Sequence, residues 1–282
     1  MARKAKTTRP GSVRSLERGL ALLVAMNRRQ LASVAELAKD THLPRPTVYR
    51  LLETLSRSGF ASRDATDRYR PALGVRALSD GYLDDEWVHE VAAPLMVEFT
   101  REHVWPISLF TFQAGRMLVR ETTHRYSALS IDYGMVGRRM PMLRTAAGLV
   151  YLAFCPDNER RTILDLLAHS DAPEDQEATE NQRLKNLFKA IRAKGYAMQE
   201  RVINPKAASI SVPICIGPDV FGCMSLIWIA SALTAEDAEK RLLSPLLTLS
   251  SRLSHGIQER RRVGPVRPAE AATARVKSPE TA

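Results

Sequence analysis

Arginine and hydroxyl side chains gather between positions 45 and 70, and their chemistry suits contacts with a polyanion. A guanidinium group presents five N–H donors in a rigid fork, which matches phosphate oxygens and the edge of a guanine base. Threonine and tyrosine hydroxyls reach phosphates or sugars. These residue types predict nucleic-acid contacts, and the candidates are Arg45, Thr47, Tyr49, Arg50, Arg57, Arg63, Arg68 and Arg70.

Four of these candidates fall in a segment with the periodicity of a helix. Aliphatic side chains from Val48 to Leu55 recur at i, i+3, i+4 and i+7, so they share one face and leave the arginines on the other. Pro46 suits a first helical position, where its missing N–H would have no partner. Gly59 suits the left-handed residue that ends a helix. The sequence therefore predicts a helix over 46–58.

The flanking segments complete a winged helix-turn-helix pattern. Ser33 and Glu36 form a capping box, which predicts a short preceding helix. The link 40–45 is so short that the two helices must cross steeply. Residues 60–70 then have the pattern of strand, tight turn and strand, which is a basic wing. We expect Arg50 to contact a base, most readily guanine, and the wing arginines to contact phosphate or the minor groove.

The positive charge is concentrated in the same part of the chain. The 282 residues carry a net charge of +10, of which residues 1–82 contribute +9 and the tail from Glu259 contributes +3. Residues 83–258 carry −2. A structural helical hairpin with a solvated charged face is the alternative interpretation, but it would not require this separation. The distribution favours a DNA-binding module followed by a nearly neutral module with another role.

Other chemistry is sparse in the sequence. Cys155, Cys215 and Cys223 have no paired spacing and are expected to be buried thiols in a reducing cytoplasm. The six histidines lack metal-ligand spacing, and no nucleophile elbow, phosphate loop or dinucleotide fingerprint is present. The N-terminus has no apolar signal core, and no apolar run is long enough to cross a bilayer. We therefore expect a soluble cytoplasmic protein without metal, cofactor, membrane contact or enzymatic activity.

Turn residues and composition suggest the domain boundaries. We expect the first helix over 16–26, capped by Ser15, with Leu16, Leu20 and Leu23 on the face that packs behind the helix-turn-helix. Asp84 to Glu86 should begin a later helix that Pro94 kinks or restarts. The predicted divisions are a disordered basic arm over 1–11, a winged helix-turn-helix domain over 12–74, a linker helix over 75–86, an effector-binding domain over 87–259 and a disordered tail over 260–282.

The second domain mixes strand and helix patterns. Strands are predicted over 107–113, 116–122, 128–132, 196–201, 209–216 and 221–229, and helices over 145–154, 159–167, 181–193 and 234–259. A single antiparallel sheet flanked by helices fits this order. Such a sheet commonly leaves a cavity for a small molecule.

With these motifs in view, the chain resembles the IclR family of bacterial transcription regulators over about 13–258. The resemblance rests on SVRSLERGLALL (12–23), LPRPTVYRLLETL (43–55), MVGRRMPMLRTAAGL (135–149), SISVPI (209–214) and CMSLI (223–227). It implies an α+β protein with a winged helix-turn-helix domain, a linker helix and a GAF-like α/β effector domain. It also implies a homodimer or dimer of dimers on a palindromic double-stranded DNA operator. Residues 119–156 are more similar still to activators of hydroxyphenylpropionate catabolic genes, and an activator implies RNA polymerase as a partner.

The resemblance also implies effector contacts, which fall on Thr145, Ala146, Ala147, Gln199, Ser209 and Ser225. Arg144 stands where many relatives have a small residue, and its fork could hold a carboxylate beside helix N–H groups. Met140, Met142 and Ile227 could supply apolar walls. Together these residues predict an aromatic carboxylic acid effector and argue against a small hydroxy- or keto-acid. The alternative for Arg144 is a surface residue paired with an acid.

The expected function is effector-dependent activation of aromatic-acid catabolic genes. Three alternatives remain: a repressor of the same type that responds to another small carboxylic acid, an enzyme with a DNA-binding appendage, and a purely architectural DNA-binding protein. No nucleophile or base can be assigned for the enzyme, and the nearly neutral second domain counts against the architectural protein. Dimerisation is expected through Leu73–Tyr82 and the outward face of the first helix.

Overall fold

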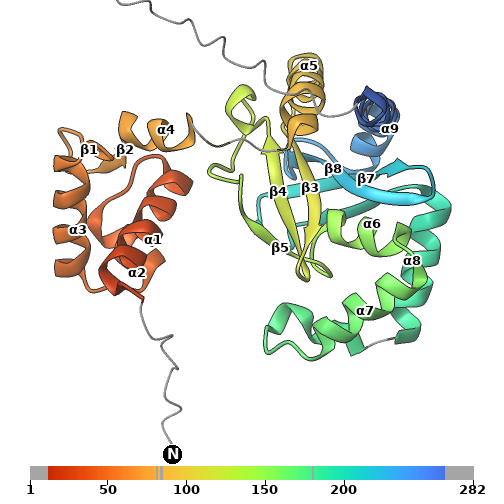
Figure 1. Ribbon diagram of the computed structural model, residues 1–282, viewed down its shortest axis with the longest axis horizontal. Helices are drawn as coiled ribbons and strands as arrows, with labels where there is room; N and C mark the ends of the chain where they lie inside the picture. The colour runs from red at the N-terminus through yellow and green to blue at the C-terminus, as the bar shows by residue number, and fades with distance from the viewer. Residues whose placement is uncertain (1–11, 81, 83–84, 180, 264–282) are drawn as a thin grey trace, which may run out of the picture.

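The computed structural model describes residues 12–80, 82, 85–179 and 181–263, and Figure 1 shows two domains joined by a linker. The predicted arm over 1–11, residues 264–282 of the predicted tail and the helix start at Asp84 lie outside the described residues. The first four residues of that tail, 260–263, are helical, so its predicted start is wrong. The first domain contains three helices and a two-stranded antiparallel wing. These elements are α1 (Arg14–Arg29), α2 (Val34–Thr41), α3 (Arg45–Arg57), β1 (Ala61–Arg63) and β2 (Tyr69–Pro71).

The core of the first domain lies where its three helices meet. Leu22, Met26, Leu37, Val48 and Leu52 are completely buried in one cluster. The helix boundaries follow the predicted chemistry, since the capping box at the start of α2 is formed in full and the glycine after α3 has a φ of 78°. The fold therefore confirms the winged helix-turn-helix predicted from spacing.

The orientation of α1 differs from the prediction. The N-cap is Val13 rather than Ser15, and it makes no side-chain capping hydrogen bond. Leu16 and Leu20 are exposed, because α1 packs on α2 and α3 through the face that carries Leu22 and Met26. The predicted inward face is therefore wrong, and this apolar stripe points to solvent.

A linker helix connects the domains. This helix, α4, spans Leu73–Asp80, slightly earlier than expected. The chain then forms a π-helical turn, η1 (Val88–Ala92), directly before α5 (Ala93–His103). Pro94 lies at the start of α5, where a residue without an N–H is tolerated, so the predicted restart of the helix is observed.

The second domain is built on a six-stranded antiparallel sheet with the order β5-β4-β3-β8-β7-β6. Its two central strands, β3 and β8, pair in a register that places Ser108 opposite Ser225. The strands are β3 (Ile107–Gln113), β4 (Arg116–Thr122), β5 (Arg139–Pro141), β6 (Ala197–Glu200), β7 (Ala207–Ile216) and β8 (Asp219–Ile229).

Helices cover both faces of this sheet, and a separate apolar cluster lies under each layer. On one face α5 packs beside α9 (Ala235–Val263), whose N-terminus is capped by Thr234 as predicted. On the other face α6 (Ala146–Phe154) lies against the strands, and α7 (Asp157–Ala168) and α8 (Asn181–Lys194) lie outside it (Figure 1). The predicted fold class, a winged helix-turn-helix domain followed by a GAF-like α/β domain, is confirmed.

One predicted strand is wrong and one was missed. Residues 128–132 form no strand, because the side chains of Ser127 and Ser130 bond to backbone carbonyls and hold a loop. The short strand β5 pairs with β4 instead. We refer to residues 127–138 as the β4–β5 loop.

No helix in the described part of the chain is long and apolar enough to span a membrane. Within the same residues, no group of three or more His, Cys, Asp or Glu side chains is arranged to hold a metal ion.

Candidate nucleic-acid interface and ligand cavity

The outward face of α3 presents the predicted base-reading residues together. Arg45, Tyr49, Arg50 and Arg57 are exposed, and Thr47 is half-buried beside them. The apolar face of the helix is held inward by its buried leucine and valine side chains. This geometry leaves the first turns of α3 free to enter a major groove.

The wing arginines differ in how firmly the protein holds them. Arg63 pairs with Asp67 at 2.5 Å, and Arg70 donates to the Ser62 hydroxyl at 3.2 Å. Both side chains are exposed. The remaining wing arginine, at position 68, is tied into the domain and is treated next.

Arg68 braces the wing against α2. Its guanidinium donates to the Glu36 carboxylate at 3.1 Å and to the Leu31 carbonyl at 3.2 Å. The carboxyl of Glu36 has a pKa below its usual range, first because the Ser33 N–H and hydroxyl donate to it, and also because Arg68 and Arg29 lie nearby. Arg68 therefore has a structural role that the sequence prediction did not include.

An apolar stripe runs along the exposed side of α1, and further exposed apolar residues follow on α4. Leu20, near the middle of the stripe, is 51% exposed. The stripe consists of Val13, Leu16, Leu20 and Val24, and the linker adds Leu73, Leu78 and Tyr82.

A cavity of about 80 Å³ lies between the sheet and the N-terminus of α6. Strands β3, β7 and β8 form its floor, and the β4–β5 loop and the segment 202–206 form two of its walls. Its lining residues are Ser108, Phe110, Asp132, Met135, Met140, Arg144, Thr145, Ala146, Ala147, Gln199, Val202, Ile203, Asn204, Ala207, Ala208, Ser209, Ser225 and Ile227.

The cavity brings together nine of the ten residues that the sequence suggested for an effector. The exception is Met142, which is fully buried in the core under α6 rather than on the cavity wall. The chain turns immediately after β5, so Met140 and Met142 do not continue along one strand face. Met142 is a packing residue, and its predicted place on the wall is wrong.

The N-terminus of α6 and the Arg144 side chain lie together at one end of the cavity. Thr145 is the N-cap, with its hydroxyl accepting from the Gly148 N–H at 3.1 Å and donating to the Pro141 carbonyl at 2.9 Å. Arg144 lines the cavity beside this terminus and also pairs with Glu177 at 3.3 Å. Both interpretations of Arg144 thus describe part of its environment. The helix terminus and the guanidinium together suit an anionic group.

Sequence reasoning missed nine lining residues, and only some had a recognisable pattern. Ser108 is fully buried in an apolar strand, where it lies opposite Ser225 in the register, and Ser225 lies opposite Ser211 on its other side. A buried serine in a central strand is a pattern that could have been found. Asp132 and Asn204 lie on irregular loops and bond to each other at 3.1 Å, and nothing in the sequence places them together.

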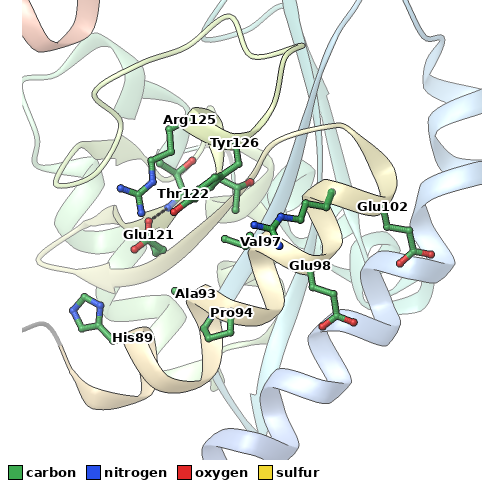
Figure 2. Close-up of a pocket in the computed structure, with 12 residues that line it drawn as sticks. His89, Ala93, Pro94, Val97, Glu98, Glu102, Glu121, Thr122, Arg125 and Tyr126 are labelled. Carbon is green, nitrogen blue, oxygen red and sulfur yellow. Dashed lines mark hydrogen bonds between the residues drawn. The ribbon is translucent and has the colours of Figure 1, made fainter.

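A larger groove of about 740 Å³ lies on the other side of the domain, between α5 and β4 (Figure 2). Its charges have both signs. Glu121 accepts from the backbone N–H of Thr122, and Glu98 pairs with Arg252 on α9. Arg125 lies over the ring of Tyr126. Because Glu98, Glu121 and Arg125 already have partners within the protein, we assign no ligand to the groove.

An exposed recognition helix with a basic wing, followed by a sheet domain with a small cavity that has apolar walls and a few polar groups, defines a ligand-responsive class of DNA-binding regulator. Family models assign the class. The IclR helix-turn-helix domain matches residues 15–65, and the bacterial transcriptional regulator IclR C-terminal domain matches residues 80–255. The chain belongs to the IclR family of bacterial transcription regulators.

Individual relatives are distant. The Pca regulon regulatory protein of Pseudomonas putida is 26% identical over 258 residues, which cover 89% of this chain and 87% of the relative. Among solved structures, the Thermotoga maritima IclR has a TM-score of 0.58 at 20% identity, with 86% of this chain and 98% of that chain covered. An IclR homologue from Microbacterium hydrocarbonoxydans, complexed with 4-hydroxybenzoate, has a TM-score of 0.54 at 18% identity, with 87% and 100% covered. These similarities establish the fold.

Proposed function

We propose that this protein is an effector-dependent activator of aromatic-acid catabolic genes. It binds a palindromic operator as a dimer or dimer of dimers and responds to a hydroxyphenylpropionate-like acid first and to a shorter aromatic acid second. The observation that carries this proposal is the composition of the cavity, which combines an anion-binding end with apolar walls and a polar far side.

Arg144 anchors the carboxylate. Its planar fork can donate two parallel hydrogen bonds to a carboxylate, and the free N–H groups at the start of α6 add further donors. Glu177 now occupies the guanidinium at 3.3 Å, but both side chains are about 40% exposed, so the pair is easily exchanged. The carboxylate of an incoming ligand displaces Glu177 from Arg144 or shares the guanidinium group with it.

The rest of the cavity suits a hydroxylated ring. Phe110, Met140 and Ile227 provide apolar contacts. Ser209 and Gln199 can donate hydrogen bonds to a ring hydroxyl or accept them from it, and the Asp132 carboxylate can accept a hydrogen bond from it. An aliphatic keto-acid would leave the apolar walls uncovered, so the lining favours an aromatic acid.

The comparisons support the same direction without deciding it. One distant relative is named for the Pca regulon, and one structural neighbour holds 4-hydroxybenzoate. In vitro transcription with purified RNA polymerase distinguishes activation, in which protein and acid together raise the transcript, from repression, in which the protein alone lowers it.

Calorimetry with 3-(4-hydroxyphenyl)propionate tests the cavity. Arg144→Ala should weaken binding by about 1.5–3 kcal/mol, the range for hydrogen bonds to a charged group. Operator affinity without the acid should stay nearly unchanged. Arg139→Ala is the matched control, because Arg139 is exposed and bonds to the carbonyls of Gln113 and Ala114 outside the cavity. Equal affinity of wild type and Arg144→Ala for the acid would exclude Arg144 as the anchor.

The apolar stripe on α1 supports the dimer. Two half-sites of an operator require two recognition helices about one helical turn apart, so one chain cannot fill both. A contiguous exposed apolar surface beside the DNA-binding helices is a characteristic site for a partner. A second copy of α1 and α4 would cover it.

A further inference from the structure

We infer that the β4–β5 loop transmits the state of the cavity to the DNA-binding domain of the same chain, through a direct contact with the C-terminal end of α1. The inference rests on the proposed function of the cavity as an effector site. It adds the physical route by which a ligand in the second domain would change DNA binding by the first.

The contact with α1 is a close approach of two backbones. Gly134 has a φ of 59°, and a Cβ at this position would lie 3.0 Å from the Asn27 side-chain nitrogen and 3.1 Å from the Arg28 backbone nitrogen. Arg138, at the end of the same loop, has a pKa below its usual value, first because of burial and then because of the charge on Arg28. The loop therefore packs so closely on the last turn of α1 that a methyl group at position 134 would fit only if α1 moved away by a few tenths of an ångström. Figure 1 shows the side of the second domain that carries this loop facing the DNA-binding domain.

The same loop forms a wall of the cavity. Asp132 and Met135 line it from positions on either side of Gly134. Asp132 accepts from Asn204 at 3.1 Å, and its carbonyl accepts from Ser130 at 2.9 Å. The Ser130 hydroxyl is also 2.6 Å from a ring nitrogen of His124. These bonds make the segment a braced unit, so a displacement of its cavity side moves its α1 side.

A ligand of the proposed size must displace such a wall. The cavity measures about 80 Å³, whereas a cavity that binds benzene measures about 150 Å³. The floor consists of central strands in which Ser225 bonds to Ser211, and such paired strands resist movement. The yielding walls are the β4–β5 loop and the segment 202–206, which the Asp132–Asn204 bond joins. Entry of an aromatic acid therefore moves the loop and alters its contact with α1.

The consequence is a coupling between two sites. A ligand can shift the position of the DNA-binding domain only by binding one arrangement more tightly than the other. In one arrangement the cavity is contracted and the β4–β5 loop packs on α1. In the other arrangement the cavity is filled and the loop is released from α1. Coupling of this kind typically changes affinity by about 5- to 150-fold, and it acts reciprocally on the ligand and the operator.

Two glycines of the loop provide a matched test. Gly134→Ala adds a methyl group against α1, whereas Gly137→Ala adds one at a φ of 79° with nothing within 4 Å. Both changes place alanine in the left-handed region at a similar cost. The added methyl group meets α1 at position 134 and meets no atom within 4 Å at position 137. Thermal denaturation verifies that both variants fold.

The readouts are operator affinity, with and without 3-(4-hydroxyphenyl)propionate, and affinity for that acid by calorimetry. We expect wild type and Gly137→Ala to change operator affinity by at least 5-fold when the acid is added. Gly134→Ala should bind the acid at least as tightly, show an altered operator affinity without it, and change by less than 2-fold on its addition. Asn27→Trp enlarges the α1 side of the contact and changes no residue of the second domain. It should likewise reduce the effect of the acid on operator affinity to less than 2-fold.

The outcomes separate the inference from the proposed function. If Gly134→Ala responds to the acid as Gly137→Ala does, the loop does not transmit the signal and the inference is overturned. If the wild-type protein does not bind the acid, the proposed effector is wrong. The inference is then tested by the operator affinities of the wild-type and variant proteins without ligand. Equal operator affinities in wild type and in the Gly134→Ala, Gly137→Ala and Asn27→Trp proteins would refute the α1 contact.

Discussion

Arginine serves two purposes in the DNA-binding domain, and the neighbours of each side chain decide which. One terminal nitrogen of Arg68 donates to the Glu36 carboxylate at 3.1 Å and to the Leu31 carbonyl at 3.2 Å, and these bonds hold its guanidinium group against the start of α2. Arg50 is exposed on the outer face of α3. From residue type alone, both arginines were predicted to contact DNA. Only the tertiary structure shows that Arg68 holds the wing against α2 and that Arg50 is free to bind a base.

Replacement of Arg50 tests base recognition. Arg50→Ala should weaken binding to the preferred operator by about 1–3 kcal/mol, the range for a lost bidentate base contact, and should relax preference at one base pair. Fluorescence anisotropy across a set of singly substituted operators measures both effects. Arg68→Ala is the comparison, and it should lower thermal stability as well as affinity. A uniform loss across all sequences for Arg50→Ala would indicate a phosphate contact instead.

Glycine at position 148 is required by packing rather than by backbone conformation. A Cβ there would overlap the carbonyl of Met142 on the facing segment. Gly148→Ala should therefore destabilise the protein by about 3 kcal/mol or more, because the buried backbone cannot move aside without loosening the core. Gly19→Ala on α1 is the matched control, since it meets nothing within 4 Å and should stabilise the helix by up to about 1 kcal/mol. Urea denaturation of both variants measures the difference.

At the level of elements, the sequence predicted what local pattern determines and missed what distant contacts determine. Strands β3 and β4 match their predicted ranges residue for residue, because alternation and a tight turn specify them. The strand predicted over 128–132 does not form, because serine side chains there make hydrogen bonds to backbone carbonyl groups in place of strand pairing. The small residues at the start of α6 predicted one side of the cavity, and the family resemblance supplied its strand contacts Ser209 and Ser225. Its loop walls depend on tertiary contacts such as Asp132 with Asn204.

The capping box of α2 is an element whose contribution can be measured. Ser33 accepts from the Glu36 N–H at 3.3 Å, and the Glu36 carboxylate accepts from the Ser33 N–H at 2.8 Å. Ser33→Ala should lower stability at pH 7 by about 0.5–2 kcal/mol, the range for loss of an N-cap. Urea denaturation followed by circular dichroism measures it. A change within error would mean that tertiary packing alone holds the start of α2.

The same box makes a pH-dependent contribution. The pKa of the Glu36 carboxyl is lowered in the folded state, so its stabilising contribution is present above the unfolded pKa and is lost as pH falls through the folded value. Glu36→Gln keeps an acceptor but removes the charge. It should be less stable than wild type near pH 7, and the two proteins should converge as the pH is lowered below the unfolded pKa of about 4.3. A constant difference between them across that range would show that the charge does not contribute.

At the scale of the whole molecule, the two domains differ in net charge and in function. Residues 1–82 carry +9 and therefore supply the attraction to DNA, whereas residues 83–258 carry −2 and enclose the cavity. The α1 stripe lies in the charged part, although like charge would keep two such domains apart in the absence of DNA. Burial of apolar surface between two copies must outweigh that repulsion, and operator phosphates would relieve it. Dimer formation should therefore be stronger at higher salt or on DNA.

Disruption of the stripe tests this assembly. Leu20→Glu places a charge in the middle of the exposed apolar face, so it should convert a dimer at micromolar concentration to a monomer. Operator binding should weaken as well, because each monomer would then bind one half-site independently. Leu166→Glu on α7 is the control, since that leucine is similarly exposed, at 55%, but lies on the second domain. Sedimentation velocity gives the mass of each protein. A Leu20→Glu protein that stays dimeric would place the principal interface outside α1, and a monomeric wild type that binds its operator as one chain would refute the dimer altogether.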